Sequence, residues 1–158
     1  NLYVISEDTT GKLVLSNAVI KNNLKTWINQ YRMINDTVDI LDPFILNFGI
    51  DFAVRAQEAA EKFTVLESCM AALKTNFEKT YFIGESLHIS DIFNVLKEVS
   101  GVLDVLKVKI NMKAGGEYST SSIDINSNLS ADGSQLIVPN NAILELKFPE
   151  VDIVGKIR

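Results

Sequence analysis

The amino-acid sequence predicts an α+β fold, in which helices cover one face of an antiparallel or mixed sheet. Residues 44–55 alternate between apolar and polar side chains, and a period of two over this length is typical of a strand with one buried face. Residues 17–32 and 63–77 instead carry apolar side chains at the three- and four-residue spacing of amphipathic helices. Because strand-like and helix-like spacings of apolar residues occur together within 158 residues, the chain is expected to form one domain of helices and strands.

The N-terminal part is expected to supply one strand and one helix before the long strand begins. Residues 2–6 form the first predicted strand, and Ser16 is a suitable N-cap for the helix over 17–32. The apolar residues of this helix, Trp27 among them, have the periodicity of core residues. Gly49 lies in the middle of the long strand, where glycine predicts a bulge or a close approach of another backbone segment.

Two more helices and a strand are expected in the middle of the chain. Thr64 and Glu67 fit a capping box at the start of the second helix. Cys69 in this helix is interpreted as a small buried hydrophobic residue. A short helix near 91–99 follows, with a half-buried strand at 106–112. The apolar stripe predicted for the second helix consists of Phe63, Leu66, Met70, Leu73 and Phe77.

The composition changes after residue 113. Residues 117–134 are rich in Ser, Asn and Asp, and two strands are expected near 142–148 and 151–157. The order of elements predicts a ferredoxin-like split βαβ sheet with helices on one face, plus a β-rich C-terminal extension. We therefore expect an α+β core domain at 1–113 and an extension at 114–158 that packs on it, as a single globular unit.

Composition argues against several classes of protein. The chain has 15 Lys and Arg against 20 Asp and Glu, a net charge of −5, whereas a nucleic-acid platform needs clustered basic residues. A single cysteine cannot form an intrachain disulfide. No segment has the apolar length of a membrane span. Because the chain opens at Asn1 on an apparent strand, without an initiator Met, we expect it to be a fragment of a longer protein.

The stretch MKAGGEYSTSS, residues 112–122, has the composition of a phosphate-binding loop but not its order. In a P-loop the lysine follows the glycines and a helix begins at once, so that the helix N-terminus meets the phosphate. Here Lys113 precedes the glycines, and strand-like residues follow them. The stretch is therefore interpreted as a mobile connector between strands.

Residues 124–135 match a calcium-binding loop only in part. Acidic or amide side chains occupy the first, third, fifth and ninth positions of the EF-hand pattern. Leu129 replaces the glycine at the sixth position, and Gln135 replaces the bidentate Glu at the twelfth. An Asx-rich turn explains these residues, so we expect no metal and no cofactor.

His88 is the single histidine and the one candidate for nucleophilic catalysis. It could activate Cys69 or Ser90, but a catalytic triad is defined by geometry and not by the presence of its members. Cys69 lies on a predicted buried stripe, and Ser90 is better explained as the N-cap of the short helix. We expect no enzyme; the alternative is a ligand-binding or enzymatic α+β domain with a cleft near His88 and Cys69.

Four stretches, in this order, resemble the C-terminal part of the baseplate wedge proteins of T-even-like contractile-tailed phages. KNNLKTWINQYRMINDTVDILDPFILNFGIDFAV, at 21–54, is similar to a helix of that family followed by paired strands. GESLHISDIFNVLKEVSGVLDV, at 84–105, looks like its short helix and V-x-G-V turn, which the broader baseplate J-like group shares. KAGGEYS, at 113–119, and LELKFPEVDIVGKI, at 144–157, resemble its closing strands.

The resemblance implies a structural protein of the virion and no catalytic residues. Such wedge subunits assemble in the host cytoplasm, pair with copies of themselves and bridge neighbouring wedge proteins in the tail baseplate. We expect a homo-oligomer in that assembly, with neither nucleic acid nor membrane as a partner. Interfaces depend on a few aromatic and arginine anchors, and the candidates here are Tyr31, Arg32 and Tyr118. Core packing is the simpler explanation of Tyr31, and plain solvent exposure that of Tyr118.

Overall fold

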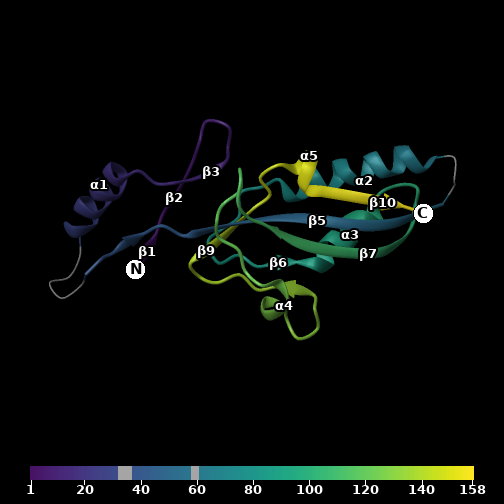
Figure 1. Cartoon of the computed structure of the whole chain (residues 1–158). Coiled ribbons are helices and arrows are strands. Elements are labelled where there is room, and N and C mark those ends of the chain that lie inside the picture. The colour runs from purple at the N-terminus through teal and green to yellow at the C-terminus, as the bar shows by residue number, and fades with distance from the viewer. Residues whose placement is uncertain (32–36, 58–60) are drawn as a thin grey trace.

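The computed structural model describes residues 1–31, 37–57 and 61–158 and has the predicted α+β class. The molecule is elongated, with a body of sheet and helices that carries the C-terminus at one end. A thinner arm, formed by the first part of the chain, extends from the other end of the body (Figure 1).

The body is built on one long central strand, β5 (Phe44–Ala56), which confirms the strand predicted at 44–55. Strand β7 (Val102–Lys113) pairs with it antiparallel. Strand β9 (Ala142–Glu145) pairs in parallel with the first part of β5, and β10 (Ile153–Ile157) pairs in parallel with its second part. The sheet is therefore mixed, and the C-terminal strands belong to the same sheet as β5 and β7.

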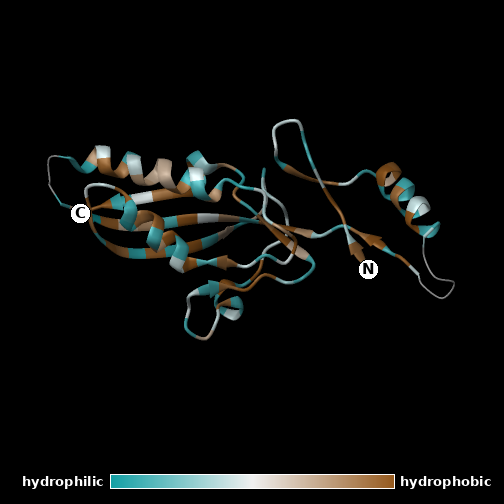
Figure 2. Ribbon diagram, turned by 180° about the vertical axis from the view of Figure 1, so that it is seen from behind, coloured by the Kyte–Doolittle hydropathy of each residue, from teal (hydrophilic) through white to brown (hydrophobic). Residues whose placement is uncertain are grey.

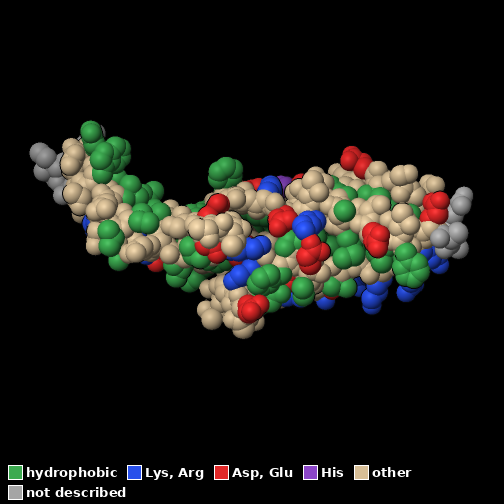
Figure 3. Space-filling model, turned by 90° about the horizontal axis from the view of Figure 1, so that it is seen from above, with side chains coloured by type: hydrophobic (Ala, Val, Ile, Leu, Met, Phe, Trp, Pro, Cys, Tyr) green, Lys and Arg blue, Asp and Glu red, His purple; other side chains and the backbone are tan. Residues whose placement is uncertain are grey.

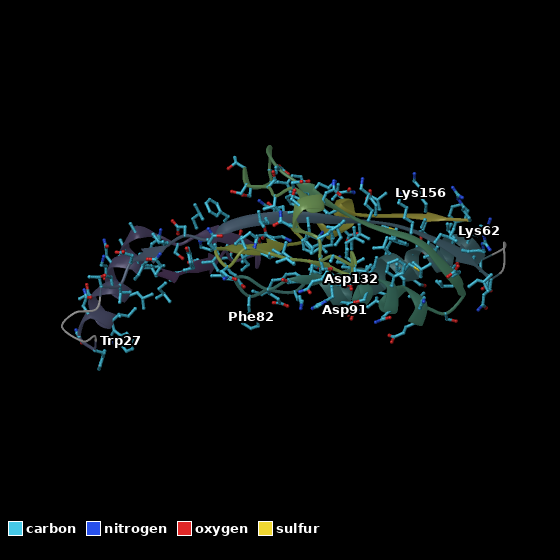
Figure 4. The ribbon with its side chains drawn as sticks, turned by 90° about the horizontal axis from the view of Figure 1, so that it is seen from below. Trp27, Lys62, Phe82, Asp91, Asp132 and Lys156 are labelled. Atoms are coloured by element: carbon cyan, nitrogen blue, oxygen red, sulfur yellow. The ribbon has the colours of Figure 1, made fainter. Side chains whose placement is uncertain are left out.

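Helices α2 (Lys62–Phe77) and α3 (Ile89–Glu98) cover one face of this sheet (Figure 4). Alternate residues of β5 point into the resulting core and are nearly inaccessible to solvent, because one face of the strand meets the helices. The buried side chains of β5 on this face are Leu46, Phe48, Ile50, Phe52 and Val54.

The stripe predicted for the second helix is wrong in part. Phe63 is 82% exposed, and the buried stripe of α2 starts at Val65. Cys69 belongs to this stripe and is fully buried, as predicted. Phe63 precedes Val65 by two positions, which places it on the opposite side of the helix. The buried residues of α2 are Val65, Cys69, Leu73 and Phe77.

The arm comprises residues 1–41 in the described ranges. Strand β1 (Leu2–Tyr3) pairs in parallel with β4 (Ile40–Leu41), and β2 (Ile5–Glu7) pairs antiparallel with β3 (Leu13–Leu15). Helix α1 (Ala18–Asn29) lies at the tip of the arm and corresponds to the helix predicted at 17–32.

Three predicted helix starts are wrong by one to three residues. Asn17 caps α1, and Ser16 is instead buried in a hydrogen bond with Ser6 of 2.8 Å between the hydroxyl oxygens. α2 begins before Thr64, and α3 begins one residue before Ser90, neither with a side-chain cap. Short polar side chains near a helix start compete for several roles, so the sequence alone does not decide which one caps.

Residues 114–134, between β7 and β8, are mostly turns and irregular segments, in keeping with the Ser-, Asn- and Asp-rich composition of 117–134. A single helical turn, α4 (Ile125–Asn128), lies in this part. Two-residue strands β6 (Leu87–His88) and β8 (Gln135–Leu136) pair antiparallel. Helix α5 (Pro149–Asp152) separates β9 from β10.

Gly49 confirms the predicted close approach of two backbone segments. A Cβ atom at this position would lie 2.8 Å from the backbone carbonyl oxygen of Asp152. A side chain of any size would therefore separate β5 from the chain segment that leads into β10.

Candidate functional site

The most unusual surface of the molecule is an apolar stripe along α1. Ile20, Leu24 and Trp27 recur at steps of four and three residues, which places them on one side of the helix, and Tyr31 lies in the turn after its last residue with its ring against Trp27. No residue of α1 is buried, although α2 and α3 each bury part of an apolar face. Figure 2 shows hydrophobic residues on this helix, far from the main sheet.

The exposed fractions of the stripe residues are large. Ile20 is 52% exposed, Trp27 59% and Tyr31 73%. The rings of Trp27 and Tyr31 form a tilted pair with centroids 5.0 Å apart. Figure 4 shows Trp27 at the tip of the arm, and Figure 3 shows hydrophobic side chains gathered at this end of the molecule. Such a ridge of rigid aromatic side chains is suited to docking against another protein.

A different side of α1 faces the chain's own strand. Lys21 Nζ lies 2.6 Å from Asp42 Oδ2, and Lys25 Nζ lies 3.7 Å from Asp39 Oδ1. These ion pairs are partly exposed and contribute little stability, but they orient the helix. With its lysines directed at residues 39–42, α1 leaves Trp27 and Tyr31 in solvent.

A buried polar network attaches the arm to the body. Glu145 Oε1 accepts a hydrogen bond from the Leu13 amide at 2.7 Å, and Glu145 Oε2 accepts one from Asn47 Nδ2 at 2.7 Å. Asn47 Oδ1 in turn accepts a hydrogen bond from the Ser119 amide at 2.7 Å. Strand β3 of the arm, β5 and β9 of the body and the connector after β7 therefore meet at one point.

The glycine connector is a tight turn packed against this junction. Gly115 and Gly116 both have positive φ, +81° and +63°, a conformation that favours glycine. Tyr118 is half-buried; its hydroxyl donates to Asp152 Oδ1 at 2.6 Å, and its ring meets Phe148 edge-on at 5.5 Å. The hydrogen bond to Asp152 raises the pKa of Tyr118 to about 12. The polar atom of Tyr118 is thus used within the chain.

The three interface candidates fall in different places. Tyr31 lies in solvent beside Trp27, whereas Tyr118 joins the connector to Asp152 and Phe148 of the body. Arg32 lies outside the described residues. Sequence reasoning missed Ile20 and Trp27, because an apolar helical period was attributed to core packing. The apolar period alone does not show whether another element covers the helix face.

The proposed cleft near His88 and Cys69 does not join these two residues. A hollow of about 330 Å³ is lined by His88 of β6, by Tyr81 and Glu85 of the segment before β6, and by residues of α2 and α3, and Cys69 is not among them. The Cys69 thiol is fully buried, and burial raises its pKa to about 11. The thiol is therefore protonated at neutral pH and shielded from a substrate.

The polar loop at 124–135 uses its carboxylates within the chain. Asp124 caps α4, and Asp132 accepts hydrogen bonds from Ser130 and Ser134, which lower its pKa to about 2. Within 1–31, 37–57 and 61–158, no group of three or more His, Cys, Asp or Glu side chains could hold a metal ion. Among the helices of these ranges, none has the length and apolar character to cross a membrane.

A scan of the chain against protein-family models gives no match. A search of curated proteins also gives no match.

Proposed function

We propose that this chain is a structural component of a phage contractile-tail baseplate wedge and acts in subunit assembly. The resemblance of residues 21–54, 84–105, 113–119 and 144–157 to baseplate wedge proteins supports the identity. The observation that carries the proposal is the exposed stripe of α1, on an arm anchored to the body through Glu145.

The arm is poorly suited to stand alone in solvent. Its strands pair only in twos, and two-stranded sheets have little independent stability in water. A contiguous apolar surface at the end of a projecting segment is typical of a site that another protein covers. Anchors at steps of four and three residues on α1, with Tyr31 just beyond its end, fit a groove or a second helix on the partner.

The proposal also includes a more specific fold for the core, the partners of the chain and its site of action. We propose a ferredoxin-like split βαβ layout for the core. Two features support it: α2 and α3 come between β5 and β7 in the sequence, and both helices pack on one face of the mixed sheet. The partners would be copies of this chain and neighbouring wedge proteins. The site of action would be the tail baseplate of the virion, after assembly in the host cytoplasm.

The test measures assembly with and without the aromatic anchors. The chain is co-expressed with the neighbouring tail proteins of its phage, captured by a tag, and analysed by size-exclusion chromatography with light scattering. We expect a complex with at least one tail protein, and at least about a tenfold loss of binding for Trp27→Ala/Tyr31→Ala.

The control is a pair of aromatic residues on the body that are at least as exposed as Trp27 and Tyr31. Phe63 is 82% exposed and Phe82 is 81% exposed, so Phe63→Ala/Phe82→Ala removes similar apolar area outside the arm. A monomer that captures no tail protein would overturn the proposed function. A complex that both double variants retain would keep the baseplate identity but reject α1 as its interface.

A further inference from the structure

Opposite α2 and α3, the part of the sheet face that includes Asp51 and Ala53 is partly exposed and carries a cluster of lysines. In the register of the sheet, Lys109 of β7 lies beside Asp51 of β5. In the next row, Lys107 and Lys156 flank Ala53 from the two sides. Figure 4 shows Lys156 on the side of the sheet away from the helices, and Figure 3 shows Lys and Arg side chains along this side of the body. We call Lys107, Lys109 and Lys156 the basic face.

The basic face surrounds a shallow apolar hollow. The hollow has a volume of about 250 Å³. Ala53, Val154 and part of Phe52 line it, together with the three lysines and Asp51. Val154 is 44% exposed. The small side chain of Ala53 leaves this space, because lysine stems rise from both neighbouring strands.

The three lysines of the basic face have one carboxylate, Asp51, beside them and no ion pair within 4.0 Å among the described residues. Asp51, the carboxylate of this face, already accepts a hydrogen bond from Asn111. Lys107 and Lys156 extend from strands two spacings, about 10 Å, apart. Clustered like charges cost stability, so their concentration in a chain of net charge −5 favours a role in binding.

Protection of sheet edges accounts for only part of this pattern. Lysines on edge strands prevent pairing with another chain, and β7 and β10 are both outer strands of the sheet. Edge protection does not require lysines of two opposite edges to face the same hollow. It also leaves unexplained the apolar floor that lies between them.

We propose that the basic face binds an acidic amphipathic helix of a partner protein. An apolar side chain of that helix would occupy the hollow over Ala53, and carboxylates on either side of it would pair with Lys107 and Lys156. Charged rims set the orientation and the rate of association, while an apolar centre contributes most of the affinity. Nucleic acid fits less well, because the floor offers no exposed aromatic ring for base stacking and the chain is acidic. This inference does not rest on the baseplate proposal or on α1.

The test uses the whole chain of 17.5 kDa and a defined probe. The probe is an 18-residue helical peptide with a leucine stripe bordered by glutamates, added up to about 1 mM, the range in which weak contacts are measurable. Binding is followed by amide shifts in two-dimensional NMR spectra. We expect shifts centred on β5, β7 and β10, binding that weakens as salt rises, and at least about a tenfold loss for Lys107→Glu/Lys156→Glu.

Two controls separate the proposal from general electrostatics. Lys62→Glu/Lys97→Glu makes the same change in net charge on the helices of the other face and should bind the peptide as the parent chain does. A peptide with glutamines in place of glutamates should bind at least about tenfold more weakly.

Three outcomes would overturn the proposal. The first is no shift of the sheet amides at the highest peptide concentration. The second is an equal loss of binding in both lysine double variants. The third is tighter binding of an 18-base-pair DNA duplex than of the acidic peptide, which would make the basic face a nucleic-acid site. Glutamate also protects a strand edge, so Lys107→Glu/Lys156→Glu is expected to leave the chain folded and its oligomeric state unchanged.

Discussion

Glu145 and Asn47 form a buried hydrogen bond of 2.7 Å between Glu145 Oε2 and Asn47 Nδ2, at the point where the arm joins the body. Asn47 is inaccessible to solvent and Glu145 is 7% exposed. The second carboxylate oxygen, Oε1, accepts from the Leu13 amide, so one side chain satisfies donors from the arm and from the central strand. Buried polar groups are tolerated only when they are paired in this way.

Replacement of Glu145 should therefore weaken the whole fold. Glu145→Leu leaves Asn47 Nδ2 and the Leu13 amide without an acceptor, and we expect the free energy of unfolding to fall by about 3 kcal/mol. The measurement is urea unfolding followed by circular dichroism. The control, Glu150→Leu, removes a carboxylate that is 75% exposed and should change the free energy by less than about 0.5 kcal/mol. Equal effects of the two substitutions would contradict the network.

A methyl group at Gly49 should separate two segments of the body. The Cβ of Gly49→Ala would lie 2.8 Å from the Asp152 carbonyl oxygen, which is backbone and cannot rotate away. We expect a loss of about 2 kcal/mol in the free energy of unfolding. Gly133→Ala is the control, because a Cβ at Gly133 would meet no atom within 4 Å although the residue has a φ of +70°. Its free energy of unfolding should fall by about 1 kcal/mol through backbone strain alone. A Gly49→Ala chain as stable as the parent would show that the two segments can move apart freely.

Features that depend on one segment of chain could be predicted from the sequence. The alternation over 44–55 fixed the strand and its buried face, because a period of two has one interpretation over that length. Gly49 predicted the close approach of another backbone segment, because a glycine within a long strand usually marks either a bulge or such an approach. The helices were also found, although their first residues were not.

What covers an apolar face could not be predicted. Trp27 and Phe63 both occur at core-like spacing, yet the structure leaves them 59% and 82% exposed. Periodicity describes one helix, whereas burial depends on which other element packs against it. The basic face shows the same limit. Lys107 and Lys109 are visible as an alternating pair, but Lys156 joins them only through the pairing of β10 with β5.

Removal of the Tyr118 hydroxyl should destabilise the junction between connector and body. Tyr118→Phe loses the 2.6 Å hydrogen bond to the buried Asp152, which keeps the hydrogen bond from the Phe148 amide at 3.0 Å. We expect the free energy of unfolding to fall by about 1.5 kcal/mol, as for a hydrogen bond to a charged group. Tyr31→Phe makes the same chemical change on a ring that is 73% exposed and should be neutral. Thermal unfolding of both variants measures the difference, and an equal shift in Tm would refute the role of Asp152.

Burial of Cys69 should make its thiol unreactive in the folded chain. Burial raises its pKa from 9.0 to about 11, so at pH 8 the folded thiol is protonated and inaccessible. We expect a thiol-specific reagent to modify the chain at least about a hundredfold more slowly in buffer than in 8 M urea. Fast modification of the native chain would show that the helix α2 opens easily or that the thiol is accessible.

The same shift in pKa predicts how stability depends on pH. Between pH 9 and about 11 the thiol is ionised in the unfolded chain but still protonated in the folded chain. The folded state then binds more protons than the unfolded state, so the free energy of unfolding falls as pH rises through this window. The contribution of the thiol is fully present below pH 9. Cys69→Ala lacks the titrating group, and the difference in free energy between parent and variant should shrink from pH 9 to 11. Parallel curves for the two chains across this window would contradict the assignment.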